Sequence, residues 1–190
     1  NLRITIARYY TPSGRCIQRP YNGKYEDYMV DEERFSNNEL YVQDKRLLAD
    51  SLKFKTLKGR FVYGGGGIQP DVFVPFDSSG TSFYLTSLQF SGAFTAFSFD
   101  YVSAKRNSWK DAKSFNEQFI VDEILSRKFI SFAAKDFKVA LNEKEYQHSK
   151  KNIAKLLKAE IARQIWTEEG FYRTINPLDI ELNTALKELK

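Results

Sequence analysis

The sequence has only one cysteine and one histidine among its 190 residues. The single cysteine, Cys16, excludes an internal disulfide framework and a zinc site built from several thiolates. The single histidine, His148, leaves one imidazole for any Ser-His or Cys-His pair. It stands among charged residues in a helical pattern, which favours a solvated surface position over a catalytic one. No apolar run is long enough to span a bilayer, and no signal-peptide pattern is present.

Concentrated positive charge is also missing. The net charge is +5, but residues 1–78 hold 12 basic and 10 acidic side chains, and residues 79–190 hold 17 and 14. Because a phosphate-binding surface needs clustered positive charge, we expect no nucleic-acid partner. Aromatic residues are abundant instead, with 16 Phe and 11 Tyr, and we expect most of them to fill a core. A chain of this length can bury about 70% of its unfolded surface, enough for a core without metal or disulfides.

Hydrophobicity alternates over residues 2–9, where the apolar side chains at even positions share one side. This period of two predicts a strand with one buried face. A strand with no turn or cap before it suggests that the chain begins inside a domain. Residues 11–14, Thr-Pro-Ser-Gly, have the composition of a tight turn, and residues 16–18 can continue as a short strand.

The stretch from 20 to 52 is polar and contains several tyrosines. It predicts a long surface insertion with little regular structure apart from a short helix near residues 46–52. Two interpretations stay open for this insertion. It either contacts a substrate or partner, or its tyrosines simply pack it onto the surface.

A hairpin is expected next, with strands at 54–56 and 60–63 joined by a turn containing Gly59. Four glycines follow at 64–67. They lack the Lys and Ser or Thr of a phosphate loop, so we interpret them as a backbone crossing with positive φ or a close approach of chains. The apolar run 72–74 predicts a buried strand.

From about residue 79 the period changes to 3.6, which predicts an all-helical region at 79–190 after a β-rich region at 1–78. The fold class expected is therefore α+β. The first expected helix is capped by Thr81 or Ser82 and reaches about Ser91. Gly92 then interrupts, and a second helix carries the apolar stripe Phe94, Phe97, Tyr101 and Val102. A third helix is expected from Asp122 to about Lys135, and a fourth from the capping box Asn142–Glu145 to a stop at Gly170. The last helix starts at Asn176-Pro177 and buries Leu178, Leu182, Leu186 and Leu189.

Few residues are candidates for a catalytic or ligand-binding role. Ser13 has no base beside it and is not in a nucleophile-elbow sequence, so we interpret it as a turn serine. Arg8 and Arg15 flank the same turn, where they either anchor it or bind a substrate carboxylate. The acidic residues of the insertion form a solvated charge run without a converging ligand: Glu26, Asp27, Asp31, Glu32 and Glu33. We therefore predict no catalytic, cofactor-binding or metal site within the chain, and no cofactor.

Two segments resemble a known family. Residues 2–18, LRITIARYYTPSGRCIQ, are similar to the strand and turn that follow the catalytic lysine in carboxyl-terminal processing (tail-specific) serine proteases. Residues 66–71, GGIQPD, resemble the Gly-Ile-x-Pro-Asp segment by which the chain re-enters the protease core. The insertion between them and the helical tail resemble envelope proteases of Bacteroidetes-type bacteria.

The resemblance implies a C-terminal portion of a periplasmic or cell-envelope serine endopeptidase that acts on protein or peptide substrates. The family uses a Ser-Lys dyad, and both residues would lie upstream of this chain, together with a PDZ module. Residues 1–78 would then complete the protease-core sheet, and the helical tail would cap or dimerise the enzyme. Alone, the chain would be inactive. The alternative is a non-catalytic interaction or self-association module.

Overall fold

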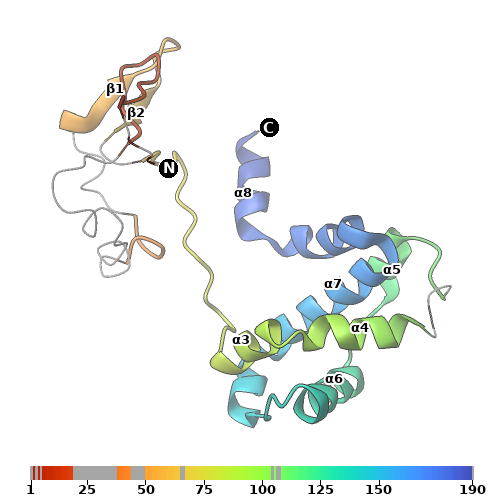
Figure 1. Cartoon of the computed structure of the whole chain (residues 1–190). Coiled ribbons are helices and arrows are strands. Elements are labelled where there is room, and N and C mark those ends of the chain that lie inside the picture. Colours follow the sequence, from red (N-terminus) through yellow and green to blue (C-terminus); the bar gives the residue numbers. More distant parts are fainter. Residues whose placement is uncertain are drawn as a thin grey trace. The chain divides into compact units, whose positions relative to one another are not determined.

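The structure is a computed structural model that describes residues 2, 4, 6–18, 38–43, 50–64, 67–103, 105 and 108–189. The chain divides into two compact units, Asn1–Asp77 and Ser78–Lys190, whereas the sequence placed the boundary after residue 78. The described residues are mostly helical, with six α-helices and one small two-stranded hairpin (Figure 1). The helical second region is therefore confirmed, and the first region holds much less strand than expected.

The hairpin of the first unit forms where the sequence predicts it. Strand β1 (Lys53–Lys55) pairs antiparallel with β2 (Phe61–Tyr63), and Phe54 lies opposite Val62. Gly59 has a φ of 83°, a conformation that glycine adopts without steric cost, and it closes the turn. A 3₁₀ turn, η2 (Asp50–Leu52), precedes β1. The rest of the predicted insertion lies outside the described residues, apart from a turn at 38–43.

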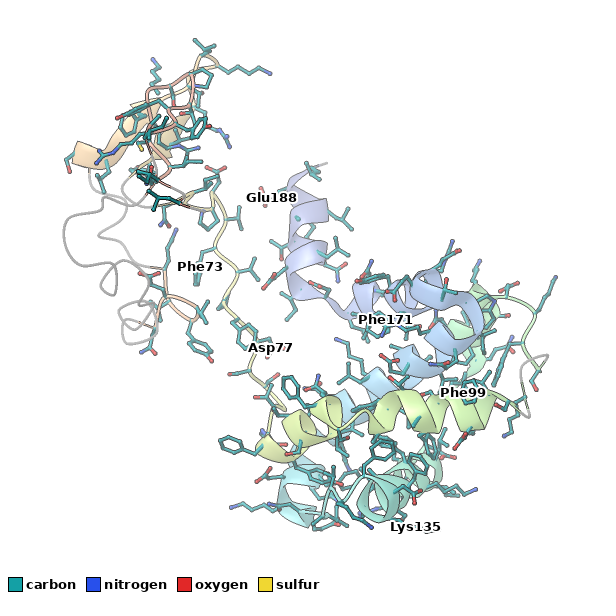
Figure 2. The ribbon with its side chains drawn as sticks, in the orientation of Figure 1. Phe73, Asp77, Phe99, Lys135, Phe171 and Glu188 are labelled. Atoms are coloured by element: carbon teal, nitrogen blue, oxygen red, sulfur yellow. The ribbon has the colours of Figure 1, made fainter. Side chains whose placement is uncertain are left out.

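Two predicted strands of this unit are wrong. Residues 2, 4 and 6–9 form no strand, and Leu2 and Ile6 are 84% and 93% exposed. The run 72–74 is not a strand and pairs with no described segment, and Val72 is 43% exposed. In Figure 2 the ribbon near Phe73 is drawn without a strand arrow. The reason is the same in both places. A strand needs a neighbour for its backbone groups, and no described segment supplies one.

The second unit is built around its longest helix. Helix α7 (Glu143–Ile175) contacts α3 (Phe83–Phe90), α4 (Ala93–Ser103), α5 (Ala112–Gln118) and α6 (Glu123–Asp136). Turn η4 (Asn176–Leu178) and helix α8 (Ile180–Glu188) follow it.

Side-chain caps explain where these helices begin. An oxygen of the residue before the helix accepts an N–H from its first turn, and the capping residues are Ser82, Asp111, Asp122, Asn142 and Asp179. The predicted starts at Ser82, Asp122 and Asn142 are confirmed. Helix α5 was not predicted, although Asp111 and Ser114 form a reciprocal capping box.

Aromatic residues fill the core of the second unit, as expected. Phe129 of α6 is fully buried and meets Phe94 and Phe97 of α4, with ring centroids 4.5 and 5.4 Å apart. Phe115 of α5 stacks on Phe119 at 4.7 Å. The fully buried face of α7 completes the core with Tyr146, Ile153, Leu157, Ile161 and Ala162.

The end of α7 and the last helix differ from the predictions. Gly170 does not stop the helix but is buried within α7. A glycine is needed there because a Cβ would lie 2.5 Å from the carbonyl oxygen of Ala162. The actual break lies earlier, at Trp166 and Thr167. Helix α8 starts from the Asp179 cap, after a 3₁₀ turn that contains Pro177. The predicted burial of its leucines is wrong, since α8 has no buried residue and Leu189 is 83% exposed.

Candidate functional site

The turn at residues 11–15 is the first part of the candidate site. The backbone N–H of Gly14 donates to the carbonyl of Thr11 at 2.8 Å, and that of Thr11 donates to the carbonyl of Arg15 at 2.9 Å. Gly14 has a φ of 82°, and an antiparallel bridge between Tyr10 and Cys16 closes the turn. The predicted turn is therefore confirmed, whereas the strand expected at 16–18 is reduced to this single bridge.

Ser13 within this turn is paired with a hydroxyl group. Its Oγ lies 2.9 Å from Oγ1 of Thr11, and no imidazole, amine or carboxylate partner of Ser13 occurs among the described residues. A serine nucleophile needs an adjacent base to remove its proton. The geometry thus agrees with a structural turn serine.

The turn contacts the start of the glycine run. Nη1 of Arg15 donates to the carbonyl oxygen of Tyr63 at 3.3 Å, a contact between residues 48 positions apart. A Cβ on Gly64 would lie 3.0 Å from Cε2 of Phe54 and 3.3 Å from Cγ of Arg15. A side chain at 64 would crowd Phe54 and Arg15, so the close approach of the turn and the hairpin favours glycine there. Gly67 has a φ of 140°, so the predicted crossing is confirmed at the two ends of the run.

A depression of about 500 Å³ lies between the turn and the hairpin, lined by Thr11, Pro12, Ser13, Arg15, Thr56, Leu57, Lys58, Arg60 and Val62. Arg60 forms an ion pair with Asp71. Nε of Arg15 is buried and has no hydrogen-bond partner. Cations and hydroxyls suit the binding of an anionic group, but this lining offers no nucleophile paired with a base. The hydrogen bond from Arg15 to Tyr63 shows that Arg15 anchors the turn, whereas Arg8 is exposed.

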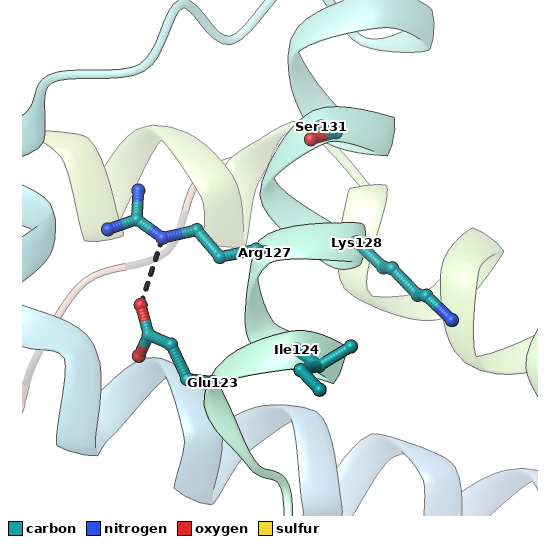
Figure 3. Close-up of a pocket in the computed structure, with 5 residues that line it drawn as sticks. All are labelled: Glu123, Ile124, Arg127, Lys128 and Ser131. Atoms are coloured by element: carbon teal, nitrogen blue, oxygen red, sulfur yellow. Dashed lines mark hydrogen bonds and ion pairs between the residues drawn. The ribbon is translucent and has the colours of Figure 1, made fainter.

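A cluster of charged residues joins α6 to α7 in the second unit. Arg127 donates through Nη1 and Nη2 to the two carboxylate oxygens of Glu143, both at 2.7 Å, and through Nε to Glu123 at 2.9 Å. The guanidinium also lies 4.4 Å from the ring centre of Tyr146, whose hydroxyl donates to Glu123 at 3.2 Å. Figure 3 shows Arg127 and Glu123 at a shallow pocket on α6. The Glu123–Arg127 spacing of four was visible in the sequence, but the contact with Glu143 was not.

This cluster shifts several pKa values. Hydrogen bonds from Arg127, helped by one from Gln147, lower the pKa of Glu143 from 4.5 to about 2. Hydrogen bonds to Glu143 and Glu123 raise the pKa of Arg127. Burial, with Tyr146 nearby, raises the pKa of Tyr84 to about 12. These shifts keep the ion pair charged and the tyrosine neutral at physiological pH, which is the behaviour of a structural cluster rather than of an acid–base pair.

A second polar junction connects the starts of α3 and α7. Oε2 of Glu145 accepts the backbone N–H of Tyr84 at 2.6 Å, while Oε1 accepts from Nδ2 of Asn142 at 3.0 Å. The buried hydroxyl of Ser149 lies 2.7 Å from that of Ser82. The sequence predicted that Glu145 would cap its own helix. Instead, it caps the neighbouring one, through a contact that spacing could not reveal.

The remaining candidate site residues do not form a cluster among the described residues. His148 is exposed on α7, and Cys16 is a half-buried free thiol in the first unit. The acidic run Glu26–Glu33 lies outside the described residues. Within the described part of the chain, no group of three His, Cys, Asp or Glu residues could hold a metal ion, and no helix is long and apolar enough to cross a membrane.

Comparison with known proteins finds a family match for one region of the chain. Residues 84–167 match a family of unknown function (DUF8443). This region runs from α3 to the break in α7 and contains the hydrophobic core of the helical unit. No curated protein and no solved structure matches the chain. The match thus follows the helical core and assigns no activity to it.

Proposed function

We propose that the first unit is the closing part of the core of a carboxyl-terminal processing serine endopeptidase, and that the helical unit is its accessory tail. In this proposal the Ser-Lys dyad and the PDZ module belong to polypeptide upstream of residue 1. The substrates are proteins or peptides, and the compartment is the periplasm or cell envelope. This chain supplies scaffold rather than catalytic groups.

One observation carries the proposal. The two segments that resemble this protease family, residues 2–18 and 66–71, are far apart in sequence, yet Arg15 of the first donates to Tyr63 beside the second. Gly64, two residues before the second segment, also lies close to Arg15 and Cys16 of the first. The proposal expects such a contact where the chain re-enters the core beside the turn.

The exposed side chains of the first unit agree with this role. Leu2, Ile4 and Ile6 alternate along the chain and are exposed, although alternation is the pattern of a half-buried strand. Additional sheet from upstream polypeptide would cover them and pair their backbone groups.

Cleavage assays on the whole gene product test the proposal. We expect that product to cleave an unstructured protein such as casein, and to lose cleavage when residues 1–77 are deleted. Arg15→Ala should weaken cleavage because the turn loses its anchor, while Lys113→Ala, an exposed cation of the helical unit, serves as the control. Cleavage by the isolated chain, or full activity after the deletion, would contradict the proposal.

A second candidate function is self-association of the helical unit. Helix α8 buries none of its residues, and Leu178 and Leu189 beside it are 57% and 83% exposed. Nine residues are too few for a stable isolated helix in water, so α8 would gain from a partner. Sedimentation over a range of concentrations tests this candidate, and a monomer at every concentration would exclude it.

A further inference from the structure

Helix α7 contains a sharp break at Trp166 and Thr167. Trp166 has φ and ψ of −121° and 20°, and Thr167 has 55° and −145°. The second conformation is close to a region occupied almost only by glycine, and threonine is β-branched. Sharp helix kinks are usually caused by proline or glycine at the break, but neither residue occurs between 143 and 169. Contacts elsewhere must therefore hold the break.

The residues after the break, 168–189, are called the arm here. The arm folds back so that Gly170 lies against Ala162, where only glycine fits. The guanidinium of Arg163 lies 3.7 Å from the ring centre of Phe171, a residue labelled in Figure 2. The hydroxyl of Thr174 donates to Oδ1 of Asn116 on α5 at 2.8 Å.

These contacts are specific but few. In the arm only Gly170 and Thr174 are buried, and α8 contributes no buried residue. Opening the arm would therefore expose little apolar surface. It would also release the strain at Thr167, because Ile165-Trp166-Thr167-Glu168 can continue as a regular helix.

We propose that the helical unit forms a dimer in which two copies exchange their arms. In each copy α7 straightens at Trp166–Thr167, which carries the arm away from Ala162 and Asn116. The arm of the second copy then makes the same contacts with these residues, and the arrangement is reciprocal about a two-fold axis. Strained hinges favour this kind of exchange because the native contacts are kept while the strain is lost. The proposal builds on the self-association candidate and is independent of the protease proposal.

Disulfide trapping between copies tests the exchange directly. Two versions of the whole chain are made in a Cys16→Ser background, one with Asn116→Cys and the other with Thr174→Cys. Each version has a single thiol, so after the two are refolded together and oxidised, a 116–174 disulfide can form only between copies. A third version with both substitutions reports the contact within one copy.

Exchange predicts a dimer by sedimentation and a 116–174 cross-link in the mixture of single-thiol chains. A dimer without this cross-link, with the double variant cross-linking only within one copy, would overturn exchange while leaving self-association intact. A monomer at every soluble concentration would overturn both. Neither result bears on the cleavage assays.

A hinge substitution provides a second readout. Thr167→Gly relieves the strain of the closed form, so the dimer dissociation constant should rise roughly thirtyfold, about fivefold for each of the two hinges. Thr86→Gly, at an exposed position of α3 outside the arm, should leave the constant unchanged. An unchanged constant in Thr167→Gly would contradict the role of the hinge.

Discussion

Glu145 connects the start of α3 to the start of α7. One carboxylate oxygen accepts the N–H of Tyr84, and the other accepts from Asn142. First-turn N–H groups have no partner within their own helix, and negative charge is favourable at helix N-termini. A single side chain thus fixes two helices that are far apart in sequence.

Replacing Glu145 should lower the stability of the helical unit. For Glu145→Ala we expect the free energy of unfolding to fall by about 1–2 kcal/mol, because a capping acceptor is lost. Glu145→Gln keeps one acceptor oxygen and should lose less. Urea unfolding followed by far-UV circular dichroism measures the free energy of unfolding of both variants. The exposed Glu117→Gln serves as the control and should change this free energy by under about 0.5 kcal/mol. Equal stability in Glu145→Ala would contradict the shared cap.

The Glu143–Arg127 pair should make stability depend on pH. The pKa of Glu143 is lowered from 4.5 to about 2 in the folded protein, so the folded state favours the charged carboxylate. Its stabilising contribution is complete above about pH 4.5 and is lost as the pH falls towards about 2. The side chain is half exposed, so the effect is screened by solvent.

Unfolding of the wild type and Glu143→Gln, compared from pH 7 to pH 2, measures this contribution. We expect the wild type to be the more stable protein at neutral pH and the difference to shrink through that window. Glu117→Gln should show a small difference at every pH. A difference for Glu143→Gln that stays constant down to pH 2 would contradict the account.

The sequence could predict where several helices begin, but not the features that depend on residues far away in the chain. The starts at Ser82, Asp122 and Asn142 were readable because a cap and its helix are close in sequence. The end of α7 was not readable, because Gly170 resembles a stop and its actual contact is with Ala162 in three dimensions. Similarly, the alternation at residues 2–9 predicted a strand, but a strand forms only when a neighbour pairs with it.

The break in α7 leads to a prediction about stability. Thr167→Gly should raise the free energy of unfolding of the closed monomer by about 1 kcal/mol, since glycine tolerates the positive φ. Thr184→Gly, the same change within regular helix α8, should lower it by about 0.3 kcal/mol, the difference in helix propensity between Thr and Gly. Chemical denaturation at a concentration where the chain is monomeric compares the two. A change in the free energy of unfolding of the same sign for both substitutions would contradict strain at the break.

At the scale of the whole molecule, the two units differ in how they bury apolar surface. The core cluster lies entirely within the helical unit. Among the described residues of the first unit, Val62 is the buried hydrophobic residue, while side chains such as Leu2 and Ile6 are exposed. The helical unit thus has its own core. The described part of the first unit has a turn, a hairpin and a chain crossing but little buried apolar surface, which is why we propose that it completes a larger core.

Hydrogen exchange of the backbone amides in residues 6–18 and 71–76 tests this central claim most directly. The amides are followed by mass spectrometry in the isolated chain and in the whole gene product. Our account predicts rapid exchange in the isolated chain and slow exchange in the whole product, because upstream strands would pair with these segments. Equally rapid exchange in both would contradict it.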